Sequence, residues 1–397
     1  MDNVERFINY AKIDTQADEN STSYPSTEKQ KNLSRLLVKE LIEMGLEDAY
    51  MDEYGVVYAH LKGEGDKIGF NAHVDTALEV TDSNVNPRII KNYDGNDISL
   101  CPGIVLSSTQ FPSLRKHIGK DLVVTDGNTL LGADDKAGIA IIMSALEYLT
   151  SHPEIKHHNI SICFTPDEEI GMGPAHFNTK IMDADYAFTI DGGDINCIDY
   201  ENFNAQSFSL DVQGVAVHPG EGKNALINAI VVINDFISAL PPKETPFDAN
   251  EDEGYWHINN LNGTSEKANL SMILRDFDEF KLQKRDNDIK EIIQKLKIKY
   301  PKAKIEYSIK WQYENMRKYV DKNPKPVEVA RKALISNGLN PRSTKIRGGT
   351  DGATFSKMGL VTPNLGTGSA NHHGRYEYLV IQDYNKMIDV ILDIMKV

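Results

Sequence analysis

The sequence predicts an α/β protein in which a mixed, mostly parallel sheet carries helices on both faces and an α+β domain is inserted into it. Two observations lead to this prediction. Short buried strand-like runs alternate with helical segments in the first half of the chain and again near its end, as is typical of parallel sheets. Between about 206 and 315 this alternation gives way to a different succession of strands and helices.

The first elements precede a long irregular stretch. A helix is expected over 27–44, where apolar residues recur at helical spacing and Gly45 supplies a stop. Strands are expected at 56–61 and 68–74. Turn signals interrupt 80–125, which predicts a loop with short strands, since a bare loop of that length would be unusual.

The rest of the first domain repeats the α/β pattern. A largely apolar helix at 136–149 is followed by buried strands at 160–165 and 186–191. After the insertion, the pattern predicts a helix at 326–338, a strand and turn at 343–352, a strand at 362–366 and a final helix at 380–396.

The inserted domain has its own order. It is expected to contain a strand at 206–214, a helix at 224–240, strands at 255–261 and 268–277, a helix at 284–300 and a strand at 303–311. This β-α-β-β-α-β succession is ferredoxin-like. The predicted domains are therefore 1–205 with 316–397, and the inserted 206–315.

Composition excludes several classes of function. The 397-residue chain has a formal net charge of -15, which argues against nucleic acid and anionic membrane surfaces as partners. It suits a small charged substrate and bound metal cations. Its three cysteines are widely spaced and predict no disulfide framework. No secretory leader or long apolar run is evident, so we expect a cytoplasmic protein.

Polar clusters follow several predicted strands, where open α/β sheets usually bind ligands. The first is "HVD", in which His73 and Asp75 are two residues apart and point to the same side of an extended segment. This pair could be a metal-ligating histidine with a carboxylate that orients its ring. An ordinary exposed strand end is the alternative.

Two acidic pairs follow. Asp134 and Asp135 precede a helix, where they could bridge two metals or simply favour the positive end of the helix dipole. Glu168 and Glu169 lie in "TPDEEIG", where adjacent carboxylates repel each other unless cations hold them. One could bind a metal and the other act as a general base toward a metal-bound water, or both could lie in an acidic turn.

Asp191 and the pair His372–His373 complete the set, although each could also lie in an ordinary loop. Adjacent histidines rarely bind one metal together, so at most one is expected to be a ligand. Nitrogen and oxygen ligands without a thiolate suit zinc, with cobalt or manganese as possible substitutes. Two histidines and three carboxylates suit two metals roughly 3.5–4 Å apart that share one carboxylate.

Motifs along essentially the whole chain resemble the dizinc exopeptidase family that includes carboxypeptidase G and aminoacylase. The motifs are "FINYAKIDTQ", "HVDT", "NVNP", "TDGNTLLGADDKAGIA", "FTPDEEIG", "DGG", "ENFNA", "VHPG", "RDFD", "IRGGTDG" and "NHHG". Three of them, "TPDEE", "ENFNA" and "IRGGTDG", are similar to its tripeptide aminopeptidase branch. The resemblance implies a zinc-dependent enzyme with two Zn²⁺ per subunit that releases the N-terminal residue from tripeptides.

The resemblance also implies roles for individual residues. His73 and Asp191 are expected to bind the first zinc, Glu169 and His373 the second, and Asp134 to bridge the two, with Glu168 as general base and Asp75 orienting His73. The family also places a cis peptide bond after the bridging aspartate, here between Asp134 and Asp135.

Three further residues are expected to bind substrate by the same resemblance. His218, in the inserted domain, corresponds to a histidine that reaches a neighbouring subunit's site in related dimers and stabilises the oxyanion. Arg275 and Arg347 resemble arginines that could take the terminal carboxylate of a peptide. A homodimer through the inserted lid domain is therefore expected. A dipeptidase, an N-acyl-amino-acid deacylase and a non-catalytic peptide-binding relative are the alternatives.

Overall fold

The computed structural model describes all 397 residues, Met1–Val397, and divides the chain into two compact units. The large unit comprises Met1–Tyr200, Met316–Thr344 and Thr350–Val397, and the small unit comprises Glu201–Asn315 and Lys345–Gly349. The small unit thus takes in 345–349, which the sequence placed in the first domain. A parallel bridge between Asn202 and Ile346 joins this segment to the start of the small unit.

A seven-stranded mixed sheet forms the centre of the large unit, in the order β1-β2-β8-β3-β9-β15-β10. Its strands are β1 Tyr50–Met51, β2 Val57–Leu61, β3 Lys67–His73, β8 Asn159–Thr165, β9 Tyr186–Ile190, β10 Ile198–Asp199 and β15 Asn364–Leu365. The four inner strands β8, β3, β9 and β15 are parallel, whereas β1, β2 and β10 pair antiparallel. The predicted α/β fold is confirmed, with the parallel part confined to the centre.

Helices cover both faces of this sheet. They are α1 Asn3–Ala11, α2 Gln30–Glu43, α3 Ala133–Ser151, α4 Thr179–Met182, α7 Arg317–Val320, α8 Lys325–Ser336, α9 Asp351–Lys357 and α10 Ile381–Met395. The nearly fully buried α3 packs against β3 and β9 and against α1 and α10. On the other face, Met182 of α4 and Phe355 of α9 pack with Cys163 of β8. None of the helices combines the length and apolar character that crossing a membrane requires.

The stretch 80–125 contains short strands, as the sequence predicted. These are β4 Arg88–Ile90, β5 Ile98–Cys101, β6 Ile104–Leu106 and β7 Leu122–Val124, with the 3₁₀ turn η1 at Pro112–His117. The strands β4 and β7 join β16 Ser369–Ala370 and β17 Tyr378–Val380 in an antiparallel sheet of order β16-β17-β7-β4, and β5 pairs with β6. This second sheet shares a core with η1, through buried residues such as Leu114, Leu122 and Tyr378.

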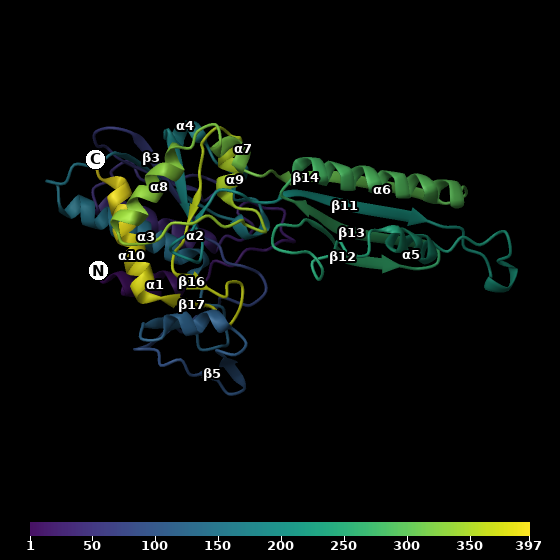
Figure 1. Ribbon diagram of the computed structural model, residues 1–397, viewed down its shortest axis with the longest axis horizontal. Coiled ribbons are helices and arrows are strands. Elements are labelled where there is room, and N and C mark those ends of the chain that lie inside the picture. Colours follow the sequence, from purple (N-terminus) through teal and green to yellow (C-terminus); the bar gives the residue numbers. More distant parts are fainter. The chain divides into compact units, whose positions relative to one another are not determined.

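The small unit has the predicted β-α-β-β-α-β order (Figure 1). Its elements are β11 Asn204–Gln213, the 3₁₀ turn η4 Pro219–Glu221, α5 Ala229–Ala239, β12 Tyr255–Gly263, β13 Lys267–Asp276, α6 Glu279–Lys299 and β14 Lys304–Tyr313. The antiparallel sheet runs β12-β13-β11-β14, and α5 and α6 pack on it through a buried apolar cluster that includes Phe208, Phe236 and Ile293.

Two sequence-based elements differ from the structure. The helix expected from 224 begins at Ala229, because Asn228 caps it through the Ile230 amide, whereas Ile227 forms a bridge with Val215. The prediction of a strand within 343–352 is wrong, because this segment contains no strand. Its last residues instead form the start of α9, for which Thr350 is the N-terminal flanking residue.

Candidate metal centre and active site

The carboxyl ends of three neighbouring parallel strands place the candidate residues at one edge of the large sheet. His73 is the last residue of β3. Thr165 ends β8, three residues before Glu168, and Ile190 ends β9 directly before Asp191. Since β8 and β9 flank β3 in register, their following loops meet beside His73. This is the edge at which open α/β sheets bind ligands.

His73 is buried at the centre of these groups. Its Nε2 lies 3.0 Å from Oδ1 of Asp134. Its Nδ1 lies 3.1 Å from the carbonyl oxygen of Asp75 and 3.4 Å from the Asp75 carboxylate. Burial lowers the pKa of His73, but hydrogen bonds to Asp134 and Asp75 outweigh it and hold that pKa well above its usual value. Both ring nitrogens therefore face carboxylate-bearing residues.

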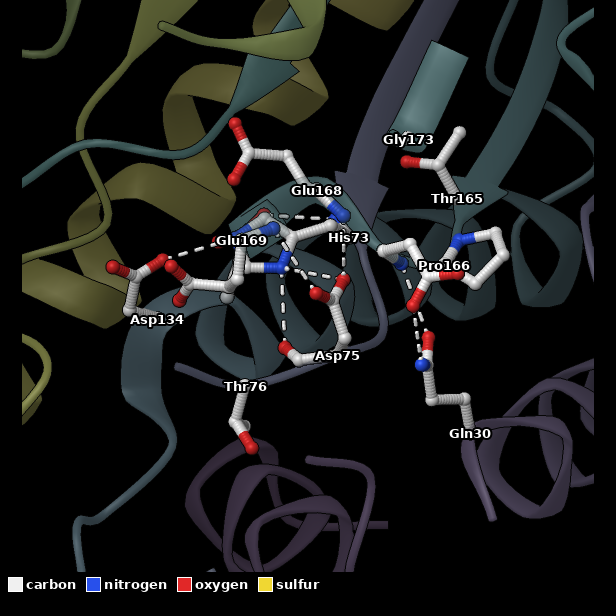
Figure 2. Close-up of polar contacts among 12 residues, drawn as sticks. Gln30, His73, Asp75, Thr76, Asp134, Thr165, Pro166, Glu168, Glu169 and Gly173 are labelled. Carbon is white, nitrogen blue, oxygen red and sulfur yellow. Dashed lines mark hydrogen bonds and ion pairs between the residues drawn. The ribbon is translucent and has the colours of Figure 1, made fainter. Parts of the chain in front are cut away.

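Asp75 also fixes the loop that carries the two glutamates. Its carboxylate oxygens accept the backbone amides of Glu168 and Glu169, each at 3.0 Å. The same carboxylate therefore contacts the His73 ring on one side and the acidic loop on the other (Figure 2). Its position suits an orienting role toward both.

The three consecutive acids of "TPDEEIG" separate because Asp167 has a left-handed backbone, with φ 62°. Its buried carboxylate accepts hydrogen bonds from the Ser26 amide and from the Gln30 side chain, each at 2.6 Å. Figure 2 shows the side chain of Glu168 pointing away from that of Glu169, whose carboxylate faces Asp134. The adjacent charges are thus distributed among three different surroundings.

Both glutamates are held in an environment that disfavours their charge. Burial raises the pKa of Glu168 well above its usual value, and the nearby carboxylates of Asp191 and Asp351 add to the effect. Burial and the Asp134 carboxylate likewise raise the pKa of Glu169. One carboxylate oxygen of Glu169 is buried without a hydrogen-bond partner. Cations at this position would stabilise these charges.

Two groups of potential metal ligands share His73. Its ring lies with Asp134 and Glu169 in one group and with Asp135 and Asp191 in the other, the ligand atoms of each lying within 4.8 Å of one another. Burial and the Asp134 carboxylate raise the pKa of Asp191 to about 6. Asp134 and Asp135 are joined by a cis peptide bond, as expected. The Asp135 carboxylate accepts the His73 amide at 3.2 Å.

The two adjacent histidines have different surroundings. The Nε2 of His373 lies 3.1 Å from a carboxylate oxygen of Glu169 and 3.4 Å from one of Asp134. His372 instead forms a 2.8 Å hydrogen bond with the Ser369 hydroxyl, and its other nitrogen lies 3.7 Å from Asp134. Of the two histidines, His373 is therefore the better placed to bind the same metal ion as Glu169.

Asp134 connects these histidines to His73. Burial alone would raise the pKa of Asp134, but His372, His373 and His73 together hold it well below its usual value. Its carboxylate accordingly remains charged among three imidazole rings, a position suited to a carboxylate shared between two cations.

The three residues expected to bind substrate lie in the small unit. His218 is exposed and accepts a hydrogen bond from the Gly220 amide in its own turn. Arg275 is buried and donates to the carbonyls of Gln206 and Leu274. Arg347 donates to the carbonyls of Asn250 and Glu251 and lies over two aromatic rings. Their roles toward a substrate stay predictions.

Several buried charged residues beside the site were not anticipated. Asp351, at the start of α9, accepts a 2.5 Å hydrogen bond from Thr165, and burial raises its pKa to about 7. Glu377 accepts backbone amides of the loop before Asp134. The buried Lys136 donates to the Ile13 carbonyl. Asp351 lies within the quoted motif "IRGGTDG", which was a usable signal, whereas no local pattern marks Glu377.

The donor set fits divalent cations. It consists of imidazole nitrogens and carboxylate oxygens, and the burial of so many carboxylates in one place is costly without positive charge. One carboxylate oxygen of Glu169 is buried without a hydrogen-bond partner, and Asp134 lies between His73 and His373. Both observations also favour bound cations. Hard and borderline cations prefer these ligands.

Comparisons with known proteins identify the family of the chain. A family model described as "Peptidase family M20/M25/M40" matches residues 124–397. The chain is 47% identical over 399 aligned residues to a protein named Peptidase T from Caldanaerobacter subterraneus subsp. tengcongensis, covering 99% of this chain and 98% of the relative.

Two solved structures have the same fold. An aminopeptidase PepT from Bacillus cereus ATCC 10987 superposes with a TM-score of 0.78 at 19% identity, covering 99% of this chain and 97% of that one. A tripeptidase from Staphylococcus aureus subsp. aureus mu50 superposes with a TM-score of 0.79 at 21% identity and the same coverage. The structures support the fold, while the family model and the full-length relative show that the chain belongs to peptidase family M20/M25/M40.

Proposed function

We propose that the protein is a metal-dependent aminopeptidase that releases the N-terminal residue from tripeptides. The observation that carries the proposal is the convergence of His73, Asp134, Glu169 and His373 beside Asp191 and Glu168. This site lies in a chain 47% identical to a protein named Peptidase T. The chain keeps a complete set of ligand and base positions, which favours an enzyme over a non-catalytic binding protein.

His73 and Asp191 would hold one cation, and Glu169 and His373 a second, with the Asp134 carboxylate shared between them. Zinc suits this mixture of imidazole and carboxylate ligands, with cobalt or manganese as substitutes. When bound, the two cations lower the pKa of a water and polarise the peptide carbonyl.

Glu168 is the proposed general base. Its carboxylate belongs to the same buried site but points away from Glu169 and toward none of the ligand groups drawn in Figure 2. Burial raises its pKa, and a carboxylate of raised pKa is a stronger proton acceptor than an exposed one. Glu168 accepts the proton of the attacking water and then donates it to the amine nitrogen as the C–N bond breaks. Asp75 orients the His73 ring and fixes the Glu168 backbone.

The small unit is the proposed lid, spanning 206–315 in the sequence-based division. In this proposal His218 stabilises the oxyanion, from its own or a partner subunit, and Arg275 and Arg347 bind the carboxylate of the peptide. Arg347 is the more available of the two arginines, since it is exposed while Arg275 is buried. We further propose a cytoplasmic homodimer that associates through this unit, with domain closure completing the site.

Hydrolysis of a matched set of a dipeptide, a tripeptide, a tetrapeptide and an N-acetylated tripeptide tests the function. The assay is run with the purified protein, after chelation and after zinc is restored. Metal-dependent release of the N-terminal residue from the free tripeptide alone supports the proposal. Comparable hydrolysis of the dipeptide or the acetylated peptide would instead make the protein a dipeptidase or an N-acyl-amino-acid deacylase.

A further inference from the structure

Glu377 is a buried carboxylate whose partners are all in one loop. It is 1% exposed. Its Oε2 accepts the amides of Leu131 and Gly132, each at 2.8 Å, and its Oε1 accepts the amide of Asp134 at 2.9 Å. Hydrogen bonds from neutral donors to an ionised acceptor are stronger than neutral pairs. The segment 131–134, where the loop leads into α3, is therefore folded around this side chain.

The backbone conformation of this segment lets three amides point toward one carboxylate. Gly132 has φ +76°, in the left-handed region that glycine adopts most readily. Successive backbone amides that turn toward one point form a concave site for an anion. Here the anion is a side chain of the same chain, 243 residues beyond Asp134.

The backbone of the same residue closes the turn that directly follows His373. The Glu377 amide donates to the Gly374 carbonyl at 3.2 Å, and Asn371 bonds to the Tyr376 carbonyl at 3.2 Å across the turn. His373 itself has φ +61° just before this turn. One residue thus holds the segment before and at Asp134 through its side chain and closes the turn after His373 through its backbone.

We propose that Glu377 is a positioning residue that fixes Asp134 and His373 relative to each other and so sets the metal affinity of the site. The side chains of these two residues approach to 3.4 Å; the Glu377 side chain binds the Asp134 amide, and the Glu377 backbone closes the turn after His373. The inference rests on the proposed metal site. Groups that orient metal ligands typically change metal affinity or activity by about 10–100-fold when they are removed.

Titration of metal-free protein with Co²⁺, followed by visible absorbance and by calorimetry, tests the proposal. Glu377→Gln keeps the size of the side chain but replaces one acceptor oxygen with a donor group that opposes an amide, and Glu377→Ala removes both acceptors. We expect Co²⁺ dissociation constants about 10–100-fold weaker than those of the unsubstituted protein, with tripeptide turnover recovering as Co²⁺ is raised. Glu377→Asp, which keeps both acceptors, should bind more tightly than Glu377→Gln.

Asp52→Asn is the matched control. The Asp52 carboxylate accepts the amides of Tyr54 and Val56, each at 2.9 Å, in a turn outside the site. We expect Asp52→Asn to leave Co²⁺ affinity unchanged, even if it lowers the thermal unfolding temperature of the metal-free protein. If the role of Glu377 were purely structural, Glu377→Gln would behave like Asp52→Asn: its unfolding temperature could fall, but its Co²⁺ affinity would not change.

Unchanged Co²⁺ binding by Glu377→Gln would overturn the proposal, whatever its turnover. If Glu377→Ala does not fold, Glu377→Gln and Glu377→Asp decide the question. An unsubstituted protein that binds Co²⁺ but cleaves no tripeptide would refute the proposed function while leaving the binding comparison valid. An unsubstituted protein that binds no Co²⁺ would refute the metal site and this inference together.

Discussion

The carboxylate of Asp75 accepts the backbone amide of Glu168 at 3.0 Å, although 93 residues separate them in the chain. Asp75 also lies 3.4 Å from the His73 ring. One side chain thus fixes the orientation of a proposed metal ligand and the position of the proposed general base.

Asp75→Asn should lower tripeptide turnover by about 10–100-fold. The amide nitrogen of asparagine cannot accept a backbone N–H, so one of the two amides of the acidic loop loses its partner, and the His73 ring loses a charged neighbour. Steady-state kinetics with saturating Zn²⁺ measures the effect. Asp97→Asn is the control, since Asp97 accepts the Ser108 amide at 2.8 Å away from the site; equal losses in both variants would contradict the orienting role.

Glu168→Gln should reduce turnover by about 10²–10⁴-fold while the protein retains its metal, because glutamine cannot accept the proton of the attacking water. Glu169→Gln should instead release metal, because a neutral amide replaces the carboxylate that lies 3.1 Å from His373. Metal content after dialysis, measured by atomic emission together with turnover, separates the two effects. If Glu168→Gln kept most of its rate, the base would have to be another group.

His373→Ala should lose metal affinity, whereas His372→Ala should lose much less. The reason is that His373 faces both Asp134 and Glu169, while His372 is hydrogen-bonded to the Ser369 hydroxyl. Calorimetric titration of Zn²⁺ into the two metal-free variants makes the comparison directly. Stronger loss in His372→Ala would reverse the ligand assignment.

The metal-free protein should become less stable as pH rises from about 4 toward 9. Burial raises the pKa of Asp351 to about 7 and of Asp191 to about 6. Because these pKa values are higher than the unfolded-state value of about 3.9, the protonated groups stabilise the folded protein fully below about pH 3.9. This stabilisation is lost as pH rises through about 6 for Asp191 and about 7 for Asp351. His373, whose pKa a hydrogen bond to Asp134 raises to about 9, loses its contribution as pH rises through that value.

Urea unfolding of the metal-free protein at several pH values measures this dependence. Asp351→Asn should flatten the curve between about pH 4 and 7, since asparagine does not titrate and its carbonyl can still accept from Thr165. A free energy of unfolding that rises with pH in this window, or an unaltered slope in Asp351→Asn, would contradict the assigned pKa shifts.

The sequence predicted those parts of the site that follow apolar strands. His73 ends a buried strand, and Glu168, Glu169 and Asp191 come soon after one. Parallel strands bring their carboxyl ends together. The ferredoxin-like order of the small unit was also predictable, because its strands and helices differ in periodicity.

Other features depend on contacts between distant segments and left no local pattern. Glu377 meets Leu131 across 246 residues, and nothing in its neighbourhood marks it as a partner of that loop. The strand expected at 343–352 failed for the same reason, because Ile346 joins the small unit through Asn202. The helix α1 was not anticipated, although its cap, the Asp2 side chain bonded to the Val4 and Glu5 amides, is entirely local.

If two cations bound around Asp134 make the protein a tripeptide aminopeptidase, its activity must follow its zinc content. Titration of the chelated protein with Zn²⁺, with tripeptide hydrolysis followed at each addition, tests this dependence most directly. We expect no turnover without metal and a rise in turnover that saturates at two equivalents of zinc. Glu168→Gln should bind the same two equivalents without turnover. Turnover that persists after complete chelation, or that saturates with no zinc bound near Asp134, would contradict this dependence.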